Sequence, residues 1–142
     1  EALLIEPRHS LPAFTVTLLL DQLALHRGYP DMIRIDNGTE LTSKIFREWA
    51  ARHNILLHYI QPGKPAQNAF IERFNRTYRE EVLDIHWFMN LAEVRYITKE
   101  WLNTYNYQRP HESLANLTPI LFAEQREKLL NKSRENSISN QF

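Results

Sequence analysis

The chain has 142 residues, 43% of them hydrophobic, and its 17 basic and 17 acidic side chains give a formal net charge of zero. This length fits one domain, and a balanced charge excludes a surface coated in positive potential, so contacts with nucleic acid must come from a local patch. There is no cysteine and no apolar run near the roughly 20 residues of a membrane span, which leaves a cytoplasmic protein without membrane contact as the expectation.

Three short apolar runs in the first half of the chain are typical of strands, at residues 2–6, 32–35 and 55–60. A helix is predicted between the first two runs, with Ser10 and Pro12 as its start signal and Gly28 as its stop. Thr42 or Ser43 can cap a second helix, which precedes the third run. Because strands alternate with helices, the chain is predicted to be an α/β protein.

The second half of the chain has helical patterns, predicted over about 68–84, from 90 onward, and from 118 to about 130. A loop rich in helix breakers, QPGKPAQ, precedes the first of them. Asn90 with Glu93 resembles a capping box at the start of the second. Residues 131–142 have too few apolar side chains to pack, so we expect a core over 1–130 followed by a mobile tail.

One acidic side chain, Glu72, lies among arginines in the segment NAFIERFNRTYREE. At 100° per residue it shares a narrow sector with Arg76 and Arg79, away from an apolar stripe of Ile71, Phe74, Tyr78 and Val82. Taken alone, this pattern describes a solvated helix whose Glu/Arg pairs each contribute about 0.2–0.5 kcal/mol.

A second acid, Asp36, follows the predicted strand at 32–35. The sequence Asp-Asn-Gly can be a simple turn, because Asn and Gly tolerate positive φ. The alternative is an acid at the carboxyl end of a strand, where ligands bind in open α/β sheets. Between Asp36 and Glu72 lie 35 residues.

These acids and their neighbours resemble the catalytic core of bacterial insertion-sequence transposases, a group related to retroviral integrases. The resemblance rests on the spacing of the acids, on NAFIERFN around Glu72, on the basic residue seven positions later, and on the turn RPHESL. It covers residues 1 to about 123. It implies an RNase H-like fold of the DDE superfamily, in which three carboxylates hold two Mg²⁺ or Mn²⁺ ions for DNA strand cleavage and joining.

The resemblance assigns roles residue by residue. Asp36 matches the second acid of the family and Glu72 the third, which makes them the candidate catalytic and metal-binding residues. Arg79 matches a basic position that faces DNA phosphate or base. Further candidate DNA-binding residues are Lys64, Asn68, Asn75 and Arg76. For His111, in the RPHESL turn, a structural hydrogen-bonding role is favoured over catalysis.

The first acid of the family has no counterpart in this sequence. In the expected strand order 3-2-1-4-5, residues 2–6, 32–35 and 55–60 are strands 3, 4 and 5. We therefore expect an N-terminally truncated core without the first two strands, inactive alone, whose two-metal site forms only in the full-length core. Asp31 cannot substitute, since it lies about 16 Å from Asp36 along an extended strand, and neither Asp21 nor Glu6 has a motif.

The expected partners are DNA, as transposon ends and target, and further copies of the chain. Without its family neighbours, the strand at 32–35 has an open edge that recruits another strand. Self-association through residues 2–6 or 32–35 is therefore favoured over a monomer in which residues 2–6 move to pair with 32–35. Two alternative functions stay open: an RNase H-like nuclease, which would lack RPHESL and TPILFA, and a non-catalytic interaction or regulatory remnant of a transposase.

Overall fold

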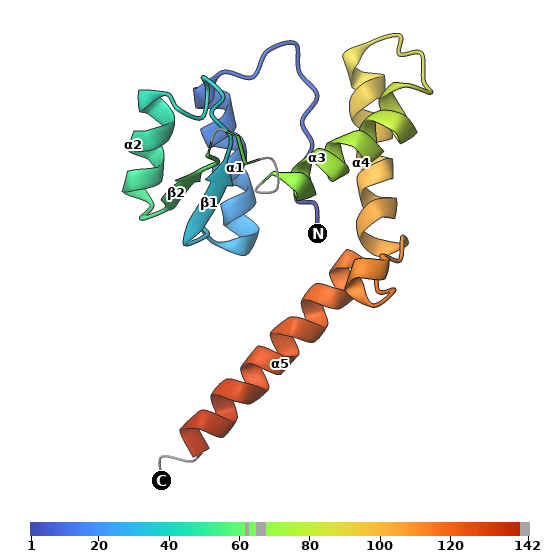
Figure 1. Ribbon diagram of the computed structural model, residues 1–142. Helices are drawn as coiled ribbons and strands as arrows, with labels where there is room; N and C mark the ends of the chain where they lie inside the picture. Colours follow the sequence, from blue (N-terminus) through green and yellow to red (C-terminus); the bar gives the residue numbers. More distant parts are fainter. Residues whose placement is uncertain (62, 65–67, 140–142) are drawn as a thin grey trace. The chain divides into compact units, whose positions relative to one another are not determined.

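The computed structural model describes residues 1–61, 63–64 and 68–139, and for residues 133–139 it describes the backbone alone. The chain divides into two compact units. One consists of residues 8–86, and the other of residues 87–142 together with residues 1–7. Figure 1 shows both units coloured along the sequence.

The unit of residues 8–86 combines helices with a two-stranded parallel sheet (Figure 1). Strand β1 (Met32–Ile35) pairs with β2 (Leu56–Tyr59) in a register that places Ile33 opposite Leu57 and Ile35 opposite Tyr59. The unit's helical segments, in chain order, are α1 (Ala13–Arg27), α2 (Lys44–Arg52), α3 (Ala69–Tyr78) and the π-helical turn η2 (Arg79–Leu83). The predicted alternation of strands and helices is confirmed from residue 13 onward.

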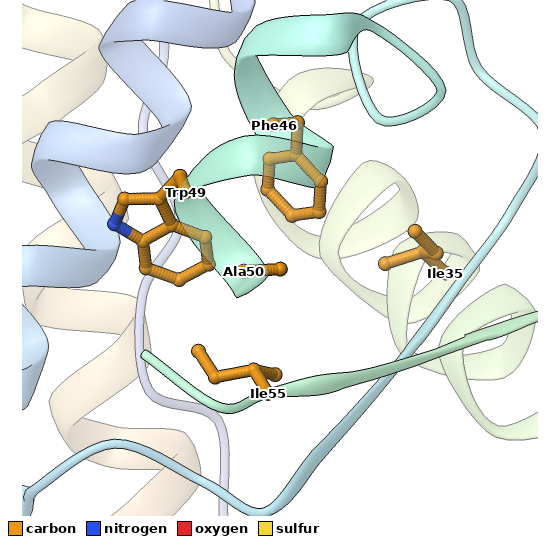
Figure 2. Packing of buried hydrophobic residues seen from close by; sticks show 5 residues of the cluster. All are labelled: Ile35, Phe46, Trp49, Ala50 and Ile55. Atoms are coloured by element: carbon orange, nitrogen blue, oxygen red, sulfur yellow. The ribbon is translucent and has the colours of Figure 1, made fainter. Parts of the chain in front are cut away.

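The hydrophobic core of this unit lies between α2 and the sheet (Figure 2). Phe46, Trp49 and Ala50 recur at helical spacing, so that they share one face of α2, and all three are buried. Ile35 at the end of β1 and Ile55 just before β2 complete the cluster. Half-buried apolar side chains surround it, namely Val16, Leu20, Ile33, Leu41, Leu57 and Tyr59. This packing fixes the end of β1, from which Asp36 projects.

Two local signals predicted for the first two helices are confirmed, namely the stop of α1 at Gly28 and the cap of α2 at Ser43. Pro12 directly precedes α1 as predicted, but no side-chain capping hydrogen bond forms at this helix start. Gly28 ends α1 with a φ of 72°, and its N–H donates to the carbonyl of Ala24 at 2.9 Å. Ser43 caps α2, since its hydroxyl oxygen accepts a hydrogen bond of 3.2 Å from the N–H of Phe46. Both signals act within one turn of chain, which is why they can be read from sequence.

The prediction of a buried strand at residues 2–6 is wrong. No strand is assigned there, and Leu3 and Leu4 are exposed. The Ala2 backbone is held instead by one side chain: its N–H donates to Asn106 Oδ1 at 2.9 Å, and its carbonyl accepts from Asn106 Nδ2 at 2.7 Å. A strand needs a neighbouring strand to bond its backbone, and in the described part of the chain β1 pairs with β2 alone.

The unit of residues 87–142 and 1–7 is helical, with α4 (Leu91–Tyr107), the 3₁₀ turn η3 (Glu112–Leu114) and α5 (Pro119–Ser139). Asn90 caps α4 as predicted, because its side chain accepts from the N–H of Glu93 at 3.0 Å. The Glu93 carboxylate reaches back to the N–H of Met89 at 2.7 Å, one residue earlier than in a standard capping box. The helix start at residue 90 is therefore confirmed.

Helix α5 continues to Ser139, which is further than the predicted end near residue 130. The mobility of residues 131–142 stays a prediction, and residues 140–142 lie outside the described part of the chain. Among the helices that the structure describes, none combines the length and apolar character required to cross a lipid bilayer.

Candidate active site

Asp36 lies directly after β1, at the carboxyl end of the parallel sheet. Ile35 before it is buried, and the Ile35 carbonyl accepts a hydrogen bond of 2.9 Å from the N–H of Ile60 at the end of β2. Asp36 itself is exposed. The strand ends are further joined by Asn37, whose side-chain Nδ2 donates to the carbonyl of Ile60 at 3.0 Å. The sequence therefore places one carboxylate on a rigid strand end, facing solvent.

The loop after Asp36 is closed by short-range hydrogen bonds. The N–H of Gly38 donates to Asp36 Oδ1 at 2.9 Å, which makes residues 36–38 an Asx turn. The Gly38 carbonyl accepts from the N–H of Leu41 at 3.1 Å and from that of Thr42 at 3.0 Å. Asp-Asn-Gly is therefore a turn and a strand-end acid together, so the two interpretations of the motif do not exclude each other.

Glu72 lies in the first turn of α3 and is exposed. A carboxylate is favoured there by the unsatisfied N–H groups of the helix start. Within the described part of the chain, Glu72 forms no ion pair with Arg76 or Arg79. Intrahelical pairing, the simplest structural explanation for this acid, is therefore absent.

Three candidate DNA-binding residues line one hollow on the α3–η2 segment. The hollow measures about 440 Å³ and is lined by Asn75, Arg76, Tyr78, Arg79 and Leu83. Arg79 opens the π-helical turn, and its carbonyl accepts from the N–H of Asp84 at 2.9 Å. A π turn widens a helix by one residue and is frequent at functional sites. Two guanidinium groups, an amide and an apolar wall thus share one surface.

The other two candidates stand apart from this hollow. Lys64, in the loop before α3, is exposed, and Asn68 is half-buried at the N-terminal end of the helix. The Asn68 side chain makes no capping hydrogen bond, while its carbonyl accepts from the N–H of Glu72 at 3.0 Å. The hollow therefore joins three of the five candidates.

Some site features were not predicted from the sequence. The helical pattern assigns Tyr78 to the apolar stripe, but Tyr78 lines the hollow together with Leu83, which the pattern does not single out. Ile71, predicted to be in the same stripe, is exposed, whereas Val82 is buried as expected. The spacing of residues 75, 79 and 83 at four-residue intervals is the signal that could have revealed the shared face.

The carboxylates present fit a hard divalent cation, because Mg²⁺ prefers oxygen ligands, and Asp36 and Glu72 are both exposed. In the residues that the structure describes, no group of three or more histidines or acids is close enough to hold a metal ion. Asp36 and Glu72 are thus exposed carboxylates that could each bind a metal ion, but among the described residues neither belongs to a cluster of three such ligands.

His111 has a structural setting. Its backbone bridges Leu117, with N–H to carbonyl at 3.1 Å, and its ring packs edge-on against Tyr105 with centroids 4.8 Å apart. Its Nε2 is buried and has no hydrogen-bond partner among the residues that the structure describes. The backbone of His111 organises the connection from α4 to α5, while hydrogen bonding by its side chain stays a prediction.

The chain matches models of a known protein family. Two models described as integrase core domain match the chain, one over residues 2–65 and the other over residues 53–119. The chain belongs to the integrase core family. Its fold is accordingly RNase H-like, with β1 and β2 as the parallel strands of that fold and Asp36 at the end of β1.

Relatives of this integrase core are proteins of bacterial insertion elements. The uncharacterized 39.2 kDa protein of insertion element IS476 from Xanthomonas euvesicatoria is 45% identical over 115 residues, 81% of this chain and 33% of that protein. The uncharacterized 31.7 kDa protein of IS407 from Burkholderia multivorans is 44% identical over 123 residues, 87% of this chain and 44% of that protein. The chain therefore spans less than half the length of these relatives, and it is an integrase core of the insertion-sequence transposase type.

A solved structure shows the same fold. A chain of the simian T-cell lymphotropic virus intasome, determined in complex with PP2A regulatory subunit B56 gamma, superposes with a TM-score of 0.50 and 19% identity. The match covers 73% of this integrase core and 37% of that chain.

Proposed function

We propose that this integrase core belongs to an enzyme that moves an insertion element by cutting and joining DNA strands. DNA integration or transposition in general follows from the family. The observation that carries the more specific proposal is the exposed carboxylate of Asp36, fixed by hydrogen bonds at the carboxyl end of a parallel strand. Phosphoryl transfer needs positioned oxygen ligands more than it needs covalent chemistry from the protein.

In this proposal Asp36 and Glu72 are the metal-binding and catalytic carboxylates. The family generally uses Mg²⁺, and a pair of such ions stabilises the attacking and the leaving oxygen of an in-line displacement. The protein's own task is to hold both carboxylates at fixed positions. The packed end of β1 does this for Asp36, and the first turn of α3 does it for Glu72.

The DNA is proposed to contact the surface of α3 and η2. Arg76 and Arg79 supply charge for phosphate oxygens, and Asn75 supplies an amide that can bond a base edge. Tyr78 and Leu83 add an apolar wall that suits the face of a base. Lys64, in the loop before α3, and Asn68, at the N-terminal end of the helix, are proposed as further contacts outside this hollow. The net charge of zero is compatible with this surface because Arg73, Arg76 and Arg79 form a local basic cluster on one helical segment.

The chain by itself is proposed to be inactive in cleavage, because Asp36 and Glu72 match two of the three carboxylates that the family resemblance implies for a two-metal site. The test is incubation of the purified chain with labelled transposon-end DNA and Mg²⁺ or Mn²⁺. The expected result is no metal-dependent cleavage. Cleavage that disappears in the Glu72→Gln variant would contradict the proposed inactivity and would at the same time support Glu72 as catalytic.

A second candidate function is a non-catalytic one, in which the chain associates with other transposase copies. The observation that favours it is the second edge of β1, which bonds to no strand in the described residues. Under this alternative the chain would inhibit a full-length transposase by joining its assembly. Added chain would then lower transposition by the full-length protein, while the Asp36→Asn variant of the chain would inhibit equally well.

A further inference from the structure

Gly38 lies between two carboxylates. A Cβ atom placed on this glycine would be 3.0 Å from Asp36 Oδ1 and 3.4 Å from Glu40 Oε2. The first of these distances is shorter than an ordinary van der Waals contact, and the Asp36 Cγ lies at 4.0 Å from the same point. A side chain at position 38 would therefore require the Asp36 carboxylate to shift by a few tenths of an ångström.

The backbone conformation does not explain why residue 38 is glycine. The chain's other two glycines, Gly28 and Gly63, have φ of 72° and 77°, a region that side chains disfavour. Gly38 is not among the positive-φ residues. An alanine there would not be forced into the positive-φ region, so the need for glycine comes from the neighbouring carboxylate.

The peptide of Gly38 has little freedom to move away from Asp36. Its N–H is bonded to Asp36 Oδ1 at 2.9 Å, and its carbonyl accepts the two N–H groups of Leu41 and Thr42. On the other side, Asn37 is bonded to the end of β2. Since the backbone is held at both ends, an added methyl group must push the Asp36 carboxylate aside by a few tenths of an ångström, which strains its hydrogen bond to the Gly38 N–H.

We infer that Gly38 is a positioning residue for Asp36, through its N–H and through the absence of a side chain. The N–H engages Oδ1, so that the second oxygen, Oδ2, is left to face a ligand. Asn37 acts with it by fixing the loop to β2. The inference concerns only the orientation of the carboxylate, and its relevance to catalysis rests on the proposed function.

The decisive variants are Gly38→Ala and, as a matched control in the same turn, Thr39→Ala. Thr39 is exposed, and its backbone carbonyl accepts a hydrogen bond of 3.3 Å from the Thr42 hydroxyl. Alanine at position 39 keeps this carbonyl. The first measurement is amide hydrogen exchange at residue 38 in the chain as it stands, corrected for the intrinsic rate of alanine and glycine. Asp36→Ala, which removes the acceptor, gives the value for an unbonded amide.

We expect the protection factor at residue 38 to fall about fivefold or more in both Gly38→Ala and Asp36→Ala and to stay unchanged in Thr39→Ala. The melting temperature of Gly38→Ala should change by less than about 2 °C, because the displaced group is an exposed side-chain end. Unchanged protection in Gly38→Ala, or a large loss of melting temperature, would overturn the inference.

The second measurement uses a longer protein that carries the family's first acid. There Gly38→Ala should raise the Mn²⁺ concentration needed for half-maximal cleavage by about tenfold without changing DNA affinity, as a displaced ligand weakens metal binding. If Gly38→Ala loses protection but Asp36→Asn leaves cleavage intact, the positioning role stands and the proposed function fails. Equal loss of DNA affinity and metal response would instead indicate a folding defect and overturn the positioning role.

Discussion

The indole Nε1 of Trp49 donates a 2.7 Å hydrogen bond to Asp21 Oδ1, which ties α2 to α1. Trp49 is almost fully buried, at 3% exposure, and belongs to the hydrophobic core. The same Asp21 oxygen accepts the hydroxyl of Tyr29 at 2.9 Å. The ring of His53 stacks on Tyr29 with centroids 3.9 Å apart. One carboxylate therefore organises the helix pair that covers the sheet.

Trp49→Phe should destabilise the unit of residues 8–86 by about 1.5–3 kcal/mol, because a hydrogen bond to a charged acceptor is lost within a packed site. Chemical denaturation followed by circular dichroism measures the change. Trp87→Phe is the matched control, since Trp87 is 97% exposed and its replacement should change stability by less than about 0.5 kcal/mol. Equal effects of the two substitutions would show that the bond to Asp21 contributes nothing.

The ionisation of Tyr29 provides a pH-dependent test of the same cluster. Loss of water around its hydroxyl, its hydrogen bond to Asp21, and the negative charge of Asp21 all raise the pKa of Tyr29 above 10.0. A raised pKa favours the neutral hydroxyl in the folded state. The contribution to stability is therefore full below pH 10 and is lost as the pH rises through the raised value.

Ultraviolet titration of tyrosinate absorbance should show one late-titrating residue in the native chain. Asp21→Asn removes the charge and should move the pKa of Tyr29 back toward its ordinary value. Tyr96→Phe, which replaces an exposed tyrosine on α4, should leave the late component in place. Persistence of the late component in Tyr29→Phe would assign it to another residue.

The two candidate catalytic acids are expected to be functional and structurally dispensable. In a longer protein that carries the first acid, Asp36→Asn and Glu72→Gln should each abolish strand cleavage. Because both side chains are exposed, the free energy of unfolding should change by less than about 0.5 kcal/mol. Cleavage assays paired with thermal denaturation separate the two effects, and a stability loss of several kcal/mol would make the acids structural.

DNA binding through the basic residues of the α3–η2 segment should weaken with increasing salt concentration. If Arg79 contacts a phosphate, Arg79→Ala should weaken DNA binding and reduce the slope of log affinity against log salt by about one unit. Arg76→Ala and Lys64→Ala should behave alike. Lys99→Ala, on the exposed surface of α4, is the control that should leave the slope unchanged. An unchanged slope in Arg79→Ala would indicate that Arg79 contacts no phosphate and only lies on a solvated helix face.

Local signals predicted the fold well because they act within a few residues. Gly28, Ser43 and Asn90 each stop or start a helix where expected, through bonds to backbone groups at most four residues away. The prediction of a strand at residues 2–6 is wrong because an apolar pattern indicates burial only. A strand also needs a neighbouring strand, which can be distant in sequence. The sequence offers no sign that Asn106, more than 100 residues later, would hold the Ala2 backbone.

The candidate site also combines a feature that could be predicted from the sequence with one that could not. The acid at the end of β1 was predictable, since a strand end followed by Asp-Asn-Gly has few alternatives. The π turn at Arg79–Leu83 could not be predicted, because the helical pattern over residues 68–84 is continuous and does not indicate an extra residue in one turn. That turn begins at Arg79 and includes Leu83, both of which line the hollow, so the grouping of side chains there depended on a backbone feature without a sequence signature.

The last prediction concerns the open edge of β1. Leu56 donates to the carbonyl of Asp31, and Ile60 donates to that of Ile35, so the peptide groups of Asp31, Ile33 and Ile35 face β2. Those of Met32 and Arg34 must then point to the opposite edge. In the described residues no strand covers that edge, and Met32 is 47% exposed. An uncovered edge of this kind pairs with another strand.

We expect the purified chain to self-associate through residues 32–35, because an open strand edge is a template for pairing with a strand of another chain. Light scattering over a range of concentrations should show a dimer. Arg34→Pro should shift it to monomer, because proline removes an N–H directed to the open edge while the bonds of Ile33 and Ile35 to β2 remain. Arg52→Ala, at the exposed end of α2, is the control. A monodisperse monomer of the unaltered chain at high concentration would contradict the prediction and show that this edge of β1 is stable without a partner.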